Sequence, residues 1–372
     1  MCGIVGYIGI RNAYPILIEG LHKLEYRGYD SAGVALITES GNLKIYKSKG
    51  KVADLESVAA NKDCSGSIGI AHTRWATHGV PSEANSHPHV SQSGDITLVH
   101  NGIIENYATL KEQLIGKGYT FKSDTDTEVL VQLIQYTKDT VPYCHFAMAV
   151  RLALKKVIGA YAIAVIDRKN PDKLVCARKS SPLAIGVTEG NKELFIASDA
   201  SPIAAYTKHI VYLNDDEIAV CERDKDIQVF NLDNKRISPE VKEVDIDLNM
   251  LSKDSFEHFM LKEIFDQPNV LRDCMRGRIV NAPYSRPWSP QKEKTNVDSL
   301  SVILSAVTLH RRELLRARRI IIVSCGTSWH AGLIGKQLIE HFCSVPVEVA
   351  YASEFRYSDS VIEPDDVVMA IS

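Results

Sequence analysis

The distribution of apolar and polar positions divides the chain into two regions. Over roughly the first 230 residues, short apolar runs alternate with a few longer amphipathic stretches, and turn-forming residues separate them. The apolar runs predict strands over residues 4–8, 67–71, 96–100, 160–166, 174–178, 183–187, 194–197 and 217–221. Several of these runs contain almost no polar residue, so we expect their sheets to be covered on both faces.

Two amphipathic stretches in this region predict helices. Thr125 and Glu128 have the spacing of a capping box ahead of a helix over residues 125–138. Its apolar stripe would consist of Val129, Leu130, Leu133 and Ile134. A second helix is predicted over residues 146–157, before Gly159. Strands with a few helices indicate a mixed α/β or α+β layer domain over residues 2–230.

The pattern changes after residue 230. Charges alternate without an apolar period, which predicts a linker over residues 231–295 that contains a helix at 256–275, interrupted by Pro268. Next come a predicted helix at 297–317, a strand at 320–324, a Gly-Thr-Ser turn, a helix at 330–342, and strands at 345–349 and 367–371. This order predicts a parallel sheet in a second domain over residues 296–372.

Composition excludes some classes of partner. The net charge of −3 gives no basic face for nucleic acid, and 45% hydrophobic with 24% charged residues is typical of globular proteins. No apolar run approaches the ~20 residues that cross a membrane, and the first residues lack the features of a signal peptide. We therefore expect a cytoplasmic protein. The eight cysteines form no C-x-x-C pair, so they predict neither a disulfide framework nor a zinc site.

Cys2 is the first candidate for chemistry. Removal of Met1 would leave one residue with a thiol, which titrates near ~8.5, and a free α-amino group, which titrates near ~7.7 to 8.0. The amine can accept the thiol proton, so Cys2 has the properties of a nucleophile with its own base. The alternative is a cysteine that follows the start codon by chance.

A polar segment at residues 72–79 follows an apolar strand. The planar guanidinium of Arg74 can bind a carboxylate through two hydrogen bonds, and Thr77 and His78 can donate further hydrogen bonds to it. The segment also contains one tryptophan, Trp75. An amino-acid substrate would suit these groups. The alternative is a surface turn with a hydrogen-bonded histidine.

The histidines of this region offer another interpretation, a metal site built from His72, His78, His87 and His89. No acidic residue stands at ligand spacing, and the last two flank Pro88. The pattern therefore favours substrate binding over a metal.

Two further segments carry candidate groups. A tight Asn101-Gly102 turn between a strand and a helix can present a side-chain amide and a backbone N–H to one developing oxyanion. Asn-Gly is also the common choice for a plain hairpin or helix-entry turn. Asp126 stands at the start of the predicted helix, where it can bind an ammonium group or simply belong to the cap.

These three segments, together with the start at residues 2–6 and the turn at residues 24–33, resemble the class II glutamine amidotransferases in matching order. The resemblance implies a four-layer αββα fold of the N-terminal-nucleophile hydrolases. It implies that Cys2 attacks the glutamine amide and that Asn101 and Gly102 form the oxyanion hole. The glutamine would be held by Arg27, Arg74, Trp75, Thr77, His78 and Asp126.

The second region is similar to the family of glutamine–fructose-6-phosphate aminotransferases. Residues 256–268 and 275–278 resemble its linker, and residues 325–331 resemble the first loop of its flavodoxin-like sugar isomerase (SIS) domain. A strand that ends in Gly-Thr-Ser before a helix suits a phosphate, because backbone N–H groups and hydroxyls meet the positive helix end. The resemblance implies a sugar-phosphate site at Gly326, Thr327, Ser328 and Ser372, with fructose 6-phosphate as ammonia acceptor and glucosamine 6-phosphate as product.

The resemblance implies no cofactor and no metal, and a homodimer or higher homo-oligomer. The sequence ends inside the first isomerase unit, so we expect a whole glutaminase and part of the sugar site. The alternatives are a stand-alone glutaminase, a sugar-phosphate-sensing regulator and a metal hydrolase built on the histidines.

Overall fold

The computed structural model describes residues 2–25, 28, 30–75, 80–244, 256–275, 279–281, 300–302 and 310–371. The chain divides into two compact units, Met1–Asp254 and Ser255–Ser372.

Two antiparallel sheets form the centre of the first unit. Within the described residues, the first sheet has the strand order β15-β11-β9-β10-β1-β4-β2-β3 and the second the order β14-β13-β12-β8-β7-β6-β5. The first consists of β1 (Gly3–Ile8), β2 (Ser31–Ile37), β3 (Leu43–Lys49), β4 (Ile68–Arg74), β9 (Ala184–Val187), β10 (Leu194–Ala197), β11 (His209–Tyr212) and β15 (Val241–Glu243). The second consists of β5 (His89–Val90), β6 (Ile96–Ile104), β7 (Gly159–Asp167), β8 (Lys173–Lys179), β12 (Glu217–Glu222), β13 (Gln228–Asn231) and β14 (Arg236–Ile237).

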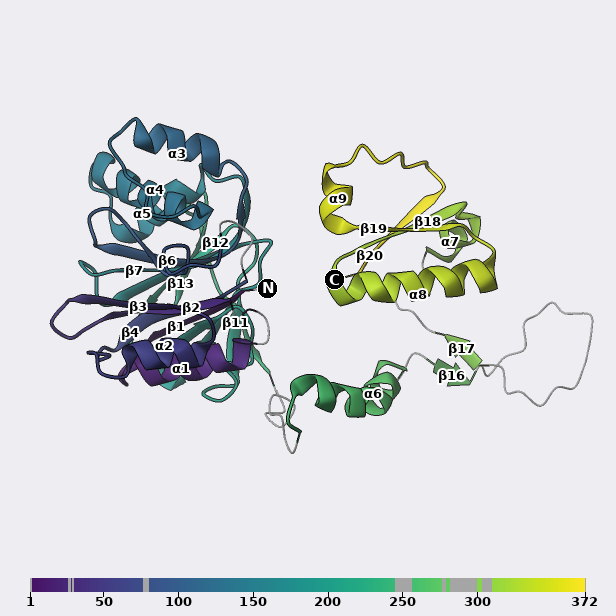
Figure 1. The fold of residues 1–372 in the computed structure, drawn as a ribbon, viewed down its shortest axis with the longest axis horizontal. Helices are drawn as coiled ribbons and strands as arrows, with labels where there is room; N and C mark the ends of the chain where they lie inside the picture. Colours follow the sequence, from purple (N-terminus) through teal and green to yellow (C-terminus); the bar gives the residue numbers. More distant parts are fainter. Residues whose placement is uncertain are drawn as a thin grey trace, which may run out of the picture. The chain divides into compact units, whose positions relative to one another are not determined.

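Helices cover the outer faces of both sheets, so the unit has four layers (Figure 1). The first sheet is covered by α1 (Ala13–Leu24) and α2 (Val52–Ala59), and the second by α3 (Tyr107–Ile115), α4 (Asp126–Thr140) and α5 (Phe146–Leu154). An apolar core lies between each pair of layers, and the central core fills the space between the sheets. Strands with two covered faces need apolar residues at almost every position, as the sequence predicts. The predicted αββα fold class is confirmed.

The first unit continues into the segment of alternating charges after residue 230. Short strands continue there: β14 pairs with β13 at the edge of one sheet, and β15 pairs with β11 at the edge of the other. Edge strands face water on at least one side, so they can carry charges that a central strand cannot. The unit thus extends beyond the predicted boundary at residue 230.

Helix α4 begins as predicted, with a different partner for its capping carboxylate. The Thr125 hydroxyl accepts the Glu128 N–H at 3.3 Å. The Glu128 carboxylate turns to the preceding loop, where it accepts the Ser123 N–H at 2.7 Å and the Lys122 N–H at 2.9 Å. The helix start is therefore tied to the loop before it, which fixes Asp126 in the first turn.

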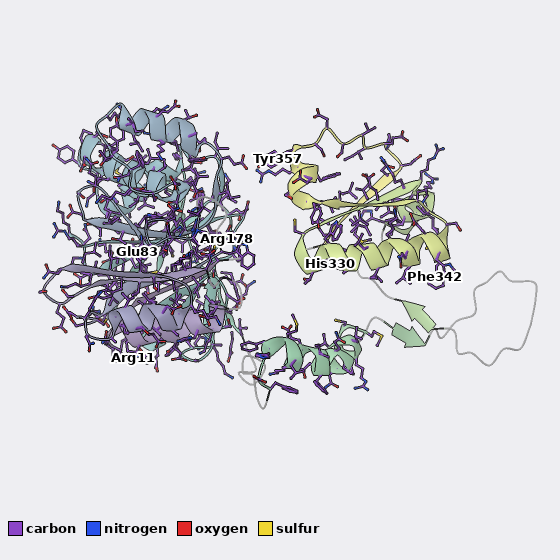
Figure 2. All side chains as sticks on the ribbon, viewed as in Figure 1. Arg11, Glu83, Arg178, His330, Phe342 and Tyr357 are labelled. Carbon is purple, nitrogen blue, oxygen red and sulfur yellow. The ribbon has the colours of Figure 1, made fainter. Side chains whose placement is uncertain are left out.

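The second unit contains a three-stranded parallel sheet in the order β19-β18-β20 among its described residues. Its elements are α6 (Phe259–Met275), β16 (Ile279–Asn281), β17 (Leu300–Val302), α7 (Arg311–Arg316), β18 (Arg319–Ser324), α8 (Gly326–Cys343), β19 (Val347–Tyr351), α9 (Ala352–Tyr357) and β20 (Asp366–Ile371). The predicted parallel sheet is confirmed. Along α8, His330 lies near the N-terminal end and Phe342 near the C-terminal end (Figure 2).

Three predictions in this unit need correction. Helix α6 runs through Pro268 without a break. Residues 300–302, predicted as helix, form β17, because they pair with β16, and the next described helix is α7. The Gly-Thr-Ser sequence is the first turn of α8 itself, not a separate turn. Among the described residues, no helix is long and apolar enough to span a membrane.

Buried histidines form an unusual polar group in the first unit. His72, His87, His89 and His100 are each at most 6% exposed, and the rings of His72 and His87 lie 4.2 Å apart between centroids. Burial disfavours the charged imidazolium, so it lowers the pKa of His72 to about 3 and holds the pKa values of His87 and His89 well below their usual range. The folded unit thus keeps three neutral imidazoles that would protonate in the unfolded chain.

These histidines predict a loss of stability in acid. An unfolded histidine titrates near ~6.5, so below that pH the unfolded chain binds more protons than the folded one. The stabilisation from these neutral histidines is complete above pH ~6.5 and decreases as the pH falls, for His72 until the pH reaches about 3. Each histidine contributes a decrease of up to ~1.4 kcal/mol per pH unit. Urea unfolding followed between pH 7.5 and 4.5 measures this slope.

The variant His89→Gln is the control for this prediction. It has one buried imidazole fewer, so its slope should be smaller by up to ~1.4 kcal/mol per pH unit, whatever its stability at neutral pH. Equal slopes for the variant and the wild type would contradict the interpretation.

Candidate active site

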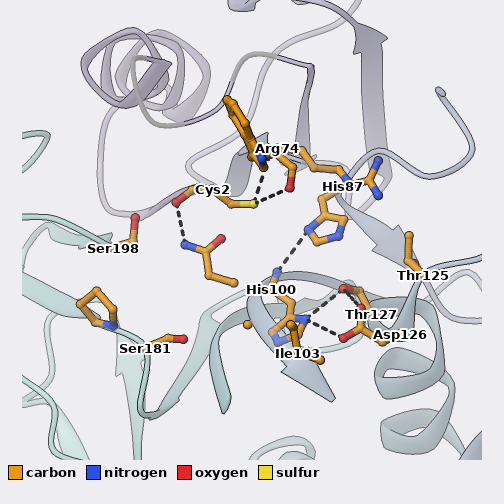
Figure 3. Close-up of a pocket in the computed structure, with 14 residues that line it drawn as sticks. Cys2, Arg74, His87, His100, Ile103, Thr125, Asp126, Thr127, Ser181 and Ser198 are labelled. Carbon is orange, nitrogen blue, oxygen red and sulfur yellow. Dashed lines mark hydrogen bonds and ion pairs between the residues drawn. The ribbon is translucent and has the colours of Figure 1, made fainter. Parts of the chain in front are cut away.

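A cavity of about 280 Å³ opens at the edge where the two sheets meet. Figure 3 shows Cys2 beside it, with Asp126 and Thr127 on one side and Ser181 and Ser198 on the other. The lining residues are Cys2, Arg74, Trp75, His87, His100, Asn101, Gly102, Ile103, Thr125, Asp126, Thr127, Ser181, Pro182 and Ser198. The cavity therefore brings together six residues that the sequence pattern selects from separate segments for glutamine chemistry, namely Cys2, Arg74, Trp75, Asn101, Gly102 and Asp126.

Cys2 immediately precedes β1, which places its thiol beside the end of the neighbouring strand β4. The backbone N–H of Trp75 donates to Cys2 Sγ at 3.2 Å, and the thiol lies 3.5 Å from the Trp75 carbonyl oxygen. These contacts hold the sulfur at the wall of the cavity (Figure 3).

Burial raises the pKa of the Cys2 thiol above its ordinary value, although the Trp75 N–H and the positive charges nearby act in the opposite direction. The thiol is therefore protonated at neutral pH. A nucleophile in this state needs a base that removes its proton during the attack.

Asn101 connects Cys2 to the other sheet. Its side-chain Nδ2 donates to the Cys2 carbonyl oxygen at 3.0 Å, and its Oδ1 lies 2.9 Å from Nε2 of His72. Both ends of the amide, which β6 of the second sheet carries, are thus bound to the first sheet: one to His72 on β4 and the other to Cys2 just before β1. The amide nitrogen faces the residue that carries the thiol, the side on which an oxyanion would form.

The sequence predicts a tight turn at Asn101 and Gly102, and this prediction is wrong. Strand β6 continues through Asn101 and Gly102 to Ile104, because all these residues pair with β7. Gly102 has φ 135°, and a Cβ atom there would lie 2.0 Å from the carbonyl oxygen of Ala160. Only glycine fits this position, so the strand distorts locally beside the cavity.

Arg74 and Trp75 end β4 and begin the segment after it. Arg74 is 4% exposed, and its side chain lines the cavity, whereas the Trp75 side chain is half exposed at its mouth. A buried guanidinium in a cavity provides the charge that a substrate carboxylate needs.

Asp126 is held at the start of α4 with its carboxylate facing the cavity. Its Oδ2 accepts the Ile104 N–H at 2.8 Å and lies 4.0 Å from Nδ1 of His100. The hydroxyl of Thr127 lies 3.0 Å from the same His100 nitrogen. This network fixes the carboxylate at the end of the cavity away from Ser198 (Figure 3).

The remaining candidates lie elsewhere. Arg27, Thr77, His78 and Ser372 lie outside the described residues. Gly326, Thr327 and Ser328 form the first turn of α8 at the carboxyl end of β18, in the second unit. Ile371, the last residue of β20, pairs with Ser324, the last residue of β18.

Several lining residues are not among the predicted glutamine-site residues, namely His87, His100, Ile103, Thr127, Ser181, Pro182 and Ser198. Of these, the sequence pattern offers His87 only as a ligand of the alternative metal site. The two histidines lie within or beside the segments that the analysis selected. Ser181 and Ser198 come from the distant strand region of β8 to β10 and carry no local signal. Among the described residues, no group of three or more His, Cys, Asp or Glu side chains is arranged to hold a metal ion.

Known families match both units. A glutamine amidotransferase domain matches residues 72–205, and an SIS domain matches residues 313–372. The glutamine–fructose-6-phosphate aminotransferase of Bacteroides thetaiotaomicron is 59% identical over 372 residues, which are all of this chain and 58% of the relative. The enzyme of the same name from Chlorobaculum tepidum is 51% identical over 375 residues, again all of this chain and 58% of the relative. The chain thus spans less than two thirds of the length of these curated relatives.

Solved structures support the fold. The glutamine phosphoribosylpyrophosphate amidotransferase from B. subtilis matches with a TM-score of 0.55 and 20% identity, over 94% of this chain and 81% of that one. At this identity the match shows the fold alone. The sequence matches, which run the full length of the chain, decide the family. The chain belongs to the family of glutamine–fructose-6-phosphate aminotransferases, with a class II glutamine amidotransferase domain followed by the beginning of an SIS domain.

Proposed function

We propose that this chain hydrolyses L-glutamine to glutamate and ammonia, with Cys2 as the nucleophile. The observation that carries the proposal is the meeting of Cys2 Sγ, the Asn101 amide and the buried Arg74 in one cavity. A plain structural cysteine has no need of an amide donor and a buried cation beside it.

The reaction would proceed through a thioester. Sγ bonds to the side-chain amide carbon while the thiol proton passes to the α-amino group of Cys2, which is free once Met1 has been removed. The negative charge that develops on the amide oxygen is bound by Asn101 Nδ2 and the Gly102 N–H. The C–N bond breaks as the amine returns the proton to the leaving nitrogen, and ammonia departs. Water then attacks the thioester, releases glutamate and restores the thiol.

The substrate would be held at its amino-acid end. Arg74 binds the α-carboxylate, and Asp126 accepts the α-ammonium group at the far end of the cavity. In the proposed site, Thr77 and His78 add hydrogen bonds to the carboxylate, Arg27 helps to position the ammonium end, and Trp75 covers the glutamine.

We further propose that the ammonia passes to fructose 6-phosphate to form glucosamine 6-phosphate, as the names of the relatives suggest. The phosphate would bind at Gly326, Thr327 and Ser328, where the first turn of α8 offers backbone N–H groups and hydroxyls, with Ser372 beside them. The whole protein would be a cytoplasmic homo-oligomer, a location that suits a nucleophile needed as a free thiol.

The first test replaces the nucleophile. We expect Cys2→Ala to abolish ammonia release from glutamine, measured with a coupled glutamate dehydrogenase assay, because no other group in the cavity can form the thioester. Cys64→Ala is the matched control, since Cys64 is also half-buried but lies outside the cavity. Wild-type activity in Cys2→Ala would contradict the proposal. Mass spectrometry of the N-terminus checks that Met1 has been removed.

The second test concerns the oxyanion donor. Asn101→Ala should lower kcat by about 10² to 10³ with little change in KM, because its amide acts on charge that develops only after glutamine is bound. Asn61→Ala, at an exposed asparagine remote from the cavity, should behave as wild type. A rise in KM at unchanged kcat would show that Asn101 binds the ground state instead.

The third test addresses the sugar phosphate. Isothermal calorimetry with fructose 6-phosphate should show binding to the chain that Thr327→Val weakens at least about tenfold, because the hydroxyl and the helix terminus share the phosphate. Gln337→Ala, exposed farther along α8, should leave the affinity unchanged. Equal affinities of the wild type and Thr327→Val for fructose 6-phosphate would contradict the proposal that the phosphate binds at this turn. Sugar binding without any glutaminase activity would favour a sensor.

A further inference from the structure

The oxyanion donor depends on the orientation of one side-chain amide. An asparagine amide can be turned by 180° with almost no change in shape, so packing alone does not decide whether oxygen or nitrogen faces the reacting atoms. In this cavity the two hydrogen-bond partners of the Asn101 side chain determine the orientation of its amide. One is the Cys2 carbonyl oxygen, an acceptor, and the other is Nε2 of His72.

The state of His72 is fixed by its surroundings. Its Nε2 lies 2.9 Å from Asn101 Oδ1 and 3.1 Å from the carbonyl oxygen of His100, and both of these atoms are acceptors when the amide has this orientation. The carbonyl oxygen accepts in every case, so the proton of the ring lies on Nε2. Nδ1 of His72 is buried and has no hydrogen-bond partner among the described residues, so a proton there would gain nothing. The depressed pKa of His72 keeps the ring neutral with this single proton.

A flipped amide would lose both of its contacts. The Asn101 nitrogen would then face the Nε2–H of His72, donor against donor, and its oxygen would face the Cys2 carbonyl, acceptor against acceptor. A buried polar group that loses its partner costs roughly 1 to 3 kcal/mol, so the flipped state would be rare. The amide nitrogen keeps one hydrogen on the Cys2 carbonyl and has a second one available for the oxyanion.

The position of His72 suits this task. It lies on β4 between β1 and β2, paired with Ile4 and Gly33, and is 1% exposed. Its ring extends across the gap between the sheets to Asn101 on β6. The hydrogen bond thus joins the sheet that carries Cys2 to the sheet that carries the oxyanion donor.

We propose that His72 is a positioning residue that holds the Asn101 amide with its nitrogen towards the oxyanion. It does not touch the substrate and acts only through Asn101. This inference rests on the proposed glutaminase function. His72→Leu should lower the kcat for glutamine by about tenfold to a hundredfold with KM changed less than about threefold, because an unrestrained amide spends part of its time in the wrong orientation.

A conservative variant separates this role from simple packing. Glutamine places an amide N–H at the position of the imidazole Nε2, whereas the shorter asparagine places it at the position of Nδ1. His72→Gln should therefore recover most of the kcat that His72→Leu loses, and His72→Asn should not. A role in packing alone predicts equal effects for the two amides, or effects that follow the stability of each variant in urea unfolding.

A double-mutant cycle decides whether His72 acts through Asn101. In an Asn101→Ala background, His72→Leu should have almost no further effect on kcat, because there is no amide left to orient. Multiplicative losses would overturn the inference, as would a wild-type kcat in His72→Leu. Cys2→Ala distinguishes failure of this inference from failure of the glutaminase proposal. If Cys2→Ala is inactive while His72→Leu has a wild-type kcat, His72 has no positioning role and the glutaminase proposal still holds. If Cys2→Ala remains active, the glutaminase proposal itself fails.

Discussion

The chemistry of the first unit depends on the two sheets approaching closely enough for side chains of one to bond groups of the other. Strands β4 and β6 lie in different sheets, and the residues at their ends meet at one edge of the sandwich. There the Asn101 amide bonds the Cys2 carbonyl and His72 bonds Asn101. The central apolar core sets this distance, since residues such as Ile4, Val99 and Ala162 fill the space between the sheets and close-packed interiors resist compression. A change of packing there would move Cys2 and Asn101 apart.

A glycine allows β6 to distort beside the cavity while it stays paired with β7. Gly102 adopts a backbone conformation that side chains avoid, and its missing Cβ leaves room for the Ala160 carbonyl oxygen of β7. The strand stays paired while its backbone rotates locally. Such a distortion within a paired strand re-aims neighbouring groups without ending the sheet.

Local sequence signals predicted the elements wherever local and tertiary preferences agree. The sequence clearly predicts β1, β7, β10 and the Thr125 cap of α4. Strands buried on both faces require continuous apolar runs, and a helix N-terminus favours a side chain such as Thr that accepts a backbone N–H. The Asn101-Gly102 pair has the local signature of a turn, but pairing with all of β7 outweighs it. Strands β14 and β15 carry charged residues, so the sequence does not predict them as strands. They form because both lie at sheet edges, where charged side chains can reach water. The site residues near Cys2 in space came from recognisable segments, whereas Ser181 and Ser198 reach the cavity only through the fold.

The burial that makes the cavity suitable for an oxyanion also decides which group can be the base. It raises the pKa of the Cys2 thiol and lowers those of the neighbouring imidazoles, in both cases because the charged form loses its solvation. Proton transfer from this thiol to His72 would be strongly unfavourable, because burial raises the pKa of the thiol and lowers the pKa of His72 to about 3. The α-amino group that Cys2 would carry after removal of Met1 ordinarily titrates near ~7.7 to 8.0, far above the pKa of His72, and it needs no separate side chain in the cavity. In the proposed mechanism the buried imidazoles are therefore neutral hydrogen-bonding groups, and the base is the α-amino group of Cys2 itself.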